Sequence, residues 1–250
     1  MLDIGYMTDT GLARKQNEDA LLVLPQEGFF VVADGVGGNN SGELASGETV
    51  KGIADFLRKN HFSAEHDKRD INLKMQACVE DVNNHVLSLS REFAENRGMA
   101  STLLMCYLRN NVAYFNNIGD SRAYSVIDGK VSRLTEDHSY VNTLLNLGVI
   151  TEEEAKNHER GNLITRAIGA EEKIQGDFSF KELDDGELII LCTDGLYREV
   201  DEKKFKMLFD MNLSMQELAN RLVEEANAAG GQDNITVVCL RYRKEAADEQ

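Results

Sequence analysis

The fold of this chain is decided by residues 102–133, TLLMCYLRNNVAYFNNIGDSRAYSVIDGKVSR. Three runs in this segment are short and rich in the branched and aromatic side chains that favour β-strands, namely 102–108, 112–118 and 123–127. Arg109-Asn110-Asn111 follows the first run, and Asp128-Gly129 separates the third run from residues 130–133. Asp-Gly is a strong signal for a two-residue β-hairpin. The segment therefore predicts consecutive strands that are joined by tight turns and pair antiparallel.

The other predicted strands and helices are grouped rather than alternating along the chain. Further strand-like runs, bounded by Gly, Asn or Asp, lie at 2–7, 20–24, 29–33, 188–192 and 235–242. Apolar residues recur at steps of three or four from Ile71 to Phe93, from Val50 to Leu57 in a segment that starts at Ser41, and from Met215 to Ala226 before Gly230-Gly231. Because hairpin-joined strands and helices occupy separate parts of the chain, we predict an α+β fold, with layered sheets flanked by helices.

Composition excludes several classes of protein. The 250 residues carry 27 Lys+Arg against 43 Asp+Glu, a net charge of −16, which argues against nucleic acid and anionic membrane surfaces as partners. No run approaches the ~20 apolar residues of a membrane span, and residues 1–5 do not look like a signal peptide. With one proline and no linker, we expect one domain over 1–243, a short charged tail at 244–250, and a soluble cytoplasmic protein.

Four aspartates share one local context, in which an apolar strand adjoins an Asp beside Gly or a small polar residue. They are Asp34, Asp120, Asp194 and Asp233. If these strand ends converge, their carboxylates repel one another until protons or a cation neutralise them. Mg²⁺ and Mn²⁺ prefer such oxygen ligands. Asp-Gly is also a common turn dipeptide, so the spacing alone leaves both interpretations open.

Arg14 belongs to the polar loop 8–19. Taken by itself, it is a surface arginine. Beside a carboxylate-bound metal pair, its planar guanidinium would act as a bidentate clamp on a phosphate.

A series of short motifs spans nearly the whole chain: GLARKQNED (11–19), VADGVGG (32–38), ASTL (100–103), NIGDSRAY (117–124), LTEDHS (134–139), TRAIG (165–169), LCTDGL (191–196) and GGQDNIT (230–236). In this order they resemble the metal-dependent serine/threonine protein phosphatases of type 2C, especially the compact bacterial-type members. The resemblance implies a central sandwich of two antiparallel β-sheets flanked by helices, in α-β-β-α layers. It also implies a flap at about 140–160 beside the metal site.

The same resemblance implies a role for each matching residue. Asp34 would bridge two Mn²⁺ or Mg²⁺ ions, the Gly35 carbonyl would ligate one of them, and Asp194 and Asp233 the other. Asp120, with Asp194, matches the position that serves a third, weaker metal. Glu18 and Asp19 would orient metal-bound waters, and Arg14 would bind the substrate phosphate.

The implied reaction is hydrolysis of phosphoserine and phosphothreonine in proteins, counteracting a Ser/Thr kinase, by a monomeric enzyme. Two ions about 3.5–4 Å apart can activate a water for in-line attack and neutralise phosphoryl charge, so no protein nucleophile is needed. Val36 is a departure, because many relatives have a histidine there that is implicated as the general acid. His138 and His158 are available in sequence, but a histidine at such a position is more often a loop or flap contact.

Two alternatives remain on sequence grounds. Residues 192–198 match Cys-x-x-Gly-x-x-Arg, the loop of cysteine-dependent phosphatases, with Cys192 as nucleophile. Asp194 within this loop and Glu199 just after it oppose both phosphate binding and a lowered thiol pKa. The other alternative is a catalytically silent relative that binds phosphoproteins as a regulator. Such proteins usually lose metal-ligand carboxylates, whereas Asp34, Asp194 and Asp233 are all present.

Overall fold

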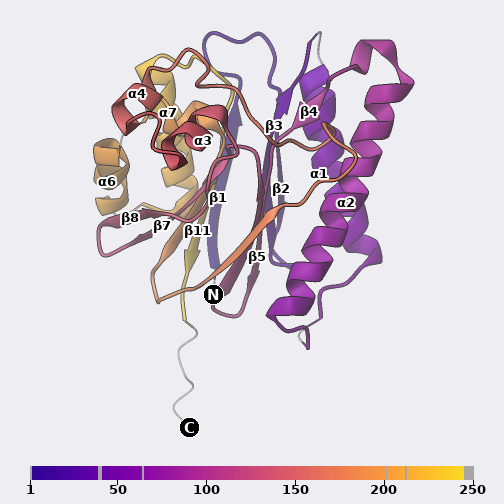
Figure 1. The fold of residues 1–250 in the computed structure, drawn as a ribbon. Coiled ribbons are helices and arrows are strands. Elements are labelled where there is room, and N and C mark those ends of the chain that lie inside the picture. The colour runs from indigo at the N-terminus through magenta and orange to yellow at the C-terminus, as the bar shows by residue number, and fades with distance from the viewer. Residues whose placement is uncertain (1, 39–40, 64, 201, 212, 245–250) are drawn as a thin grey trace.

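The computed structural model describes residues 2–38, 41–63, 65–200, 202–211 and 213–244. Two antiparallel sheets pack face to face between helices (Figure 1). One sheet has the strand order β1 (Leu2–Asp9), β11 (Ile235–Tyr242), β10 (Leu188–Cys192), β7 (Arg122–Ile127) and β8 (Lys130–Arg133). The other has the order β2 (Asp19–Leu24), β3 (Phe29–Val36), β5 (Leu103–Arg109), β6 (Val112–Ile118) and β9 (Asp177–Glu182), and β4 (Ala100–Ser101) pairs with β3.

Helices cover the outer face of each sheet. α1 (Ser41–Lys59) and α2 (Lys68–Glu92) lie against the β3 sheet, and α7 (Met215–Ala229) lies against the β11 sheet beside α6 (Glu202–Asp210) (Figure 1). The shorter helices are α3 (Tyr140–Asn146), α4 (Glu152–Lys156), α5 (Asp194–Tyr197) and the 3₁₀ turn η1 (Ala94–Asn96). The predicted α-β-β-α sandwich is therefore confirmed.

Strand burial explains why several runs are apolar without interruption. In β3, Val31 points into the core under α1 and α2, while Phe30 and Val32 point into the core between the sheets. In β10, Ile190 likewise faces the α7 side and Leu191 the other sheet. A strand that is covered on both faces has no solvent face to mark with polar residues.

Both predicted turns are present. Asn110 has φ +56° between β5 and β6, while Asp128 and Gly129 have φ +49° and +69° between β7 and β8. Two successive positive φ angles match the right-handed twist of the paired strands, which favours Asp-Gly at this place.

The structure corrects some expected boundaries. α2 ends at Glu92, so Phe93 is not part of its apolar stripe; it is the extended cap residue and is 44% exposed. The predicted strand 102–108 begins at Leu103. Thr102 lies between β4 and β5 and still faces Asp34 of β3: its N–H donates to Asp34 O at 2.8 Å, and its Oγ1 accepts from Asp34 N and bonds to Ser121 Oγ. The predictions did not include β4, β9, or the helices α3 to α6. β9 is an edge strand with exposed positions, so its apolar signal is weak.

The predicted flap region 140–160 contains α3 and α4, which lie together near the α6 and α7 side (Figure 1). Of the predicted tail 244–250, only Lys244 is among the described residues. Within the described ranges, no helix combines the length and apolar character needed to cross a bilayer.

Candidate metal centre

Acidic residues from both sheets meet at one end of the sandwich. Asp19 opens β2 and lies opposite Asp34 in the β2–β3 ladder. Asp194 follows β10, Asp233 precedes β11, and Asp120 lies in the connection between β6 and β7. The charges of the other four all act on Asp34. The convergence expected from the strand-end pattern is therefore present in the fold.

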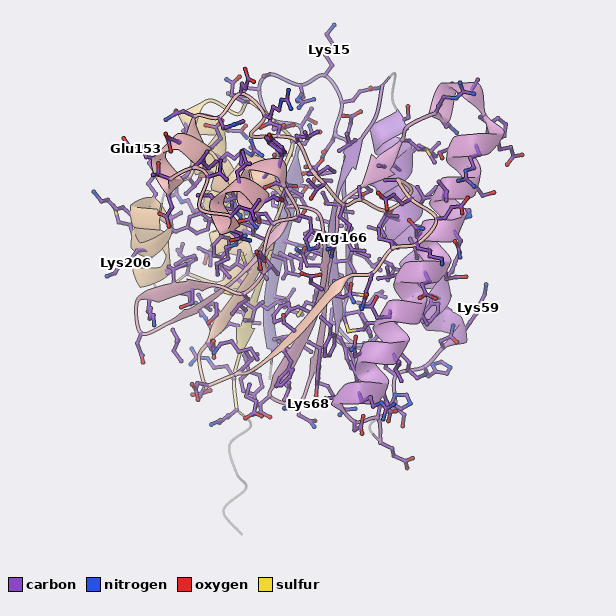
Figure 2. All side chains as sticks on the ribbon, in the orientation of Figure 1. Lys15, Lys59, Lys68, Glu153, Arg166 and Lys206 are labelled. Carbon is purple, nitrogen blue, oxygen red and sulfur yellow. The ribbon has the colours of Figure 1, made fainter. Side chains whose placement is uncertain are left out.

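Arg14 lies on a loop that is fastened to the end of β11. Gly231 O accepts hydrogen bonds from Leu12 N (2.8 Å) and Ala13 N (3.0 Å). Gly11 has φ +76°, and a side chain there would begin 2.1 Å from Asp233 O, so this close approach requires glycine. Arg14 Nη2 then donates to Asp233 Oδ2 at 2.8 Å. The neighbouring Lys15 points away from the molecule at this end (Figure 2).

The Asn234 side chain binds the backbone of the same loop. Its Nδ2 donates to Thr10 O (2.8 Å) and Gln16 O (2.9 Å), and its Oδ1 accepts from Glu18 N (2.8 Å). The Asn234 side chain is buried, so water cannot readily replace these bonds. One amide thus fixes the path of the loop that carries Arg14.

Gly35 is held between the loop and α1. Its N–H donates to Glu18 O at 3.0 Å, and a Cβ on Gly35 would lie 2.0 Å from Gly42 O. A larger residue would have to push α1 away, so the position requires glycine. The carboxyl group of Glu18 lies against Gly42 at the start of α1.

The carboxyl groups hold their protons more tightly than isolated aspartates do. Burial, with the neighbouring negative charges, raises the pKa of Asp19 and of Asp120 to about 7. For the same reasons the pKa of Asp34 is well above its usual value, and the pKa of Asp194 is raised although Arg198 opposes the shift. Such a group of acids is stabilised by protons or by cations.

The donor set fits divalent cations. Asp19 Oδ1 and Asp194 Oδ1 are buried and have no hydrogen-bond partner among the described residues. Carboxylate and carbonyl oxygens are the ligands that Mg²⁺ and Mn²⁺ prefer. In the described part of the chain, no three His, Cys, Asp or Glu side chains are already close enough to form a metal cage. Arginines hold some of the carboxylates instead, Arg14 on Asp233 and Arg198 on Asp194.

The two histidines considered as acids have other contacts. His138 is buried; its Nδ1 accepts from Gly119 N at 3.1 Å, and its Nε2 lies 3.2 Å from Asp177 Oδ2. His158 Nδ1 accepts from Arg160 N at 3.1 Å. These contacts join His138 to the β6–β7 connection and to the start of β9, and His158 to a residue of its own loop.

The cysteine-loop alternative is wrong. Cys192 is fully buried in the core of the α7 side, and burial raises the pKa of its thiol to about 12. Arg198, the arginine of that motif, is bound to carboxylates. A protonated thiol beneath the sheet surface cannot attack a phosphate.

Sequence reasoning missed several residues that build this end of the molecule. Asn234 lies within the motif GGQDNIT, which gives no indication of the three backbone groups that its amide binds. Thr193 is buried, and its Oγ1 donates to Asp19 Oδ2 at 2.8 Å and accepts from Thr236 N at 3.0 Å. The sequence pattern marks Arg198 only as part of the cysteine loop, although its spacing of four from Asp194 is that of an ion pair on one helical face.

A two-sheet sandwich with converging carboxylates and an arginine on the same rim defines the class of metal-dependent phosphohydrolases. A family model described as "Protein phosphatase 2C" matches residues 13–229. The chain belongs to the protein phosphatase 2C family, whose members are metal-dependent serine/threonine phosphatases.

Relatives agree over almost the full length. The serine/threonine phosphatase stp of Listeria monocytogenes serotype 4b is 32% identical over 238 residues, which cover 94% of each chain. The crystal structure of the serine/threonine phosphatase PstP of Mycobacterium tuberculosis has a TM-score of 0.87 and 30% identity, covering 97% of this chain and 99% of that one. The catalytic domain of PstP in complex with two manganese ions has a TM-score of 0.83 and 30% identity, covering 98% and 100%. The predicted family, enzyme class and Mn²⁺/Mg²⁺ dependence are confirmed.

Proposed function

We propose that this chain hydrolyses phosphoserine and phosphothreonine in proteins. The observation that carries the proposal is the gathering of Asp34, Asp120, Asp194 and Asp233 at one end of the sandwich, with Arg14 fixed on the same rim. Carboxylates alone would repel a phosphate dianion. When cations neutralise the carboxylates, an arginine beside them can bind the phosphate.

We assign the ligands as the sequence motifs suggest. Asp34 would bridge two ions, with the Gly35 carbonyl on one ion and Asp194 and Asp233 on the other, and Asp120 with Asp194 would hold a third. When bound, the ions supply activation of a water and neutralisation of the phosphoryl charge. The orphan Oδ1 of Asp194 supports this assignment.

The remaining polar groups would orient the reactants. Arg14 is half-exposed, so its guanidinium can turn from Asp233 towards a phosphate in solution. Glu18 and Asp19 would accept hydrogen bonds from waters on the ions, and Thr193 holds the Asp19 carboxylate in place. Val36 has no acidic proton, so the leaving alkoxide would take its proton from a water or from another group rather than from residue 36.

A cavity of about 830 Å³ offers a place for the polypeptide around the phosphorylated residue. It is lined by Val36, next to Gly35, by α2 and by residues between 164 and 178. Asn72 and Gln76 of α2 line one side, and Arg166, labelled in Figure 2, lines the other. Asn72 contributes a polar side chain to this lining, and its Oδ1 has no hydrogen-bond partner in the described part of the protein.

We further propose a cytoplasmic, monomeric signalling enzyme that counteracts a Ser/Thr kinase and binds neither membranes nor nucleic acid. The net charge of −16 supports the last two statements and disfavours self-association. Residues 1–243 would form one catalytic domain with a flap at about 140–160, followed by the tail 244–250.

The test is turnover of p-nitrophenyl phosphate with Mn²⁺ and then with excess chelator. We expect hydrolysis that requires the metal, a loss of roughly 100-fold or more in Asp34→Asn, and a raised KM in Arg14→Ala. A folded protein with no metal-dependent turnover would favour the silent phosphoprotein-binding regulator instead.

A further inference from the structure

Arg198 occupies an unusual position at the edge of the candidate metal centre. It follows the single turn α5, four residues after Asp194, so its side chain returns to the same carboxylate. Its Nε lies 2.9 Å from Asp194 Oδ2, and its Nη2 lies 3.4 Å from Asp120 Oδ2. One guanidinium therefore lies between the carboxylate that follows β10 and the carboxylate in the β6–β7 connection.

The same guanidinium reaches the chain that leaves the flap region. Nη2 donates to Gly161 O at 3.3 Å, and Nη1 donates to Asn162 Oδ1. All three side-chain nitrogens of Arg198 thus contact an acceptor, and together they contact four acceptor oxygens. Arg198 is the connection between Asp120, Asp194 and residues 161–162.

These contacts are more than a surface ion pair. The side chains of Asp120 and Asp194 are only 6% and 12% exposed, so their charges are poorly screened by water. Tyr197 supports the arrangement, because its hydroxyl donates to Asp120 O at 3.1 Å and its ring stacks on the Arg122 guanidinium at 3.6 Å. Asp120 is therefore held by Arg198 at its carboxylate and by Tyr197 at its backbone carbonyl.

We propose that Arg198 is a positioning residue that acts as an internal cation at the Asp120–Asp194 pair and tethers the end of the flap to it. This inference rests on the proposed function, in which those two carboxylates would hold a third, weaker ion. The guanidinium already uses Oδ2 of both carboxylates, so a third ion that takes the same two oxygens has to displace it. Such a displacement releases Gly161 and Asn162.

The proposal predicts two linked effects of replacing Arg198. Without the competing charge, the weakest Mn²⁺ site should bind about tenfold more tightly in Arg198→Ala. Without the tether, hydrogen exchange of residues 157–163 should become fast and independent of Mn²⁺. In the unchanged protein the same segment should lose protection as the weakest site fills.

The experiment combines calorimetric titration of Mn²⁺ with hydrogen-exchange mass spectrometry on the whole chain. Asn162→Ala should speed exchange at 157–163 and leave ion affinity nearly unchanged. Arg160→Ala is the matched control: it removes one positive charge from the same segment, where Arg160 pairs with Glu159, and should change neither property. If Arg198→Ala folds poorly, Arg198→Gln removes the charge while retaining hydrogen-bonding capacity, and it should still tighten the ion.

Each result has a distinct meaning. Unchanged affinity for the weakest ion in both Arg198 variants overturns the competition, and unchanged exchange at 157–163 in Arg198→Ala overturns the tether. In either case, if two tighter Mn²⁺ ions still bind and p-nitrophenyl phosphate is still hydrolysed, only this inference fails. If the unchanged protein binds no Mn²⁺, the proposed function fails as well.

Discussion

Replacing Asn234 by alanine should weaken both the fold and the rim that carries Arg14. The change removes three hydrogen bonds of 2.8–2.9 Å, to Thr10 O, Gln16 O and Glu18 N. Each such bond contributes about 1 kcal/mol net, so the free energy of unfolding should fall by about 3 kcal/mol. For a chain of this length, that loss corresponds to roughly 6–12 °C in Tm.

The assays are urea unfolding for stability and p-nitrophenyl phosphate kinetics for function. The bonds of Leu12 and Ala13 to Gly231 remain in the variant, so the loop should loosen rather than detach. We expect KM to rise about three- to tenfold, because Arg14 must then be ordered when phosphate binds.

The matched control is Gln232→Ala, two residues earlier. Gln232 is exposed and its amide donates to the nearby Gly230 O, so its replacement should change stability by less than about 0.5 kcal/mol. An Asn234→Ala protein whose unfolding free energy and KM both match the control would refute the role given to this amide.

Three more outcomes follow from the same geometry. The pKa of Asp19 and Asp120 is about 7 in the folded chain, well above an unfolded value near 4, so the folded state binds more protons between these limits. The free energy of unfolding without metal should therefore fall as pH rises from about 4 to 7. Mn²⁺ binding should release protons and become weaker below pH 7. Calorimetry in buffers of different ionisation enthalpy would detect the proton release, and a Mn²⁺ affinity that does not depend on pH would contradict this prediction. Cys192→Ser should lose about 1–3 kcal/mol of stability, because a hydroxyl replaces a buried thiol, yet retain turnover per folded molecule; complete loss in folded protein would restore the cysteine mechanism. Asn72→Ala should raise KM for a phosphopeptide but not for p-nitrophenyl phosphate, and equal effects on both substrates would exclude the cavity as a peptide site.

Much of the fold could be predicted because its signals are local. The hairpins at Asn110 and Asp128-Gly129 depend on backbone angles of single residues, and α7 ends at Gly230 as predicted. The apolar stripe of α2 was evident from its periodicity. Its end was not, since Phe93 continues the spacing but not the helix. The edge strand β9 was missed because half-exposed strands carry little apolar signal.

Most strands, the long helices and the acids at the strand ends can be predicted from the sequence, because each of these is encoded by neighbours along the chain. That those strand ends share one rim depends on how the two sheets pack. The tertiary structure alone brought Asn234 to the loop 10–18 and joined Arg198 to Asp120 and to Asn162. These contacts link residues that are 36 to 224 positions apart. The side-chain chemistry at one position does not specify a partner at that distance. The partner is fixed only when the packing of the two sheets sets where each chain segment lies.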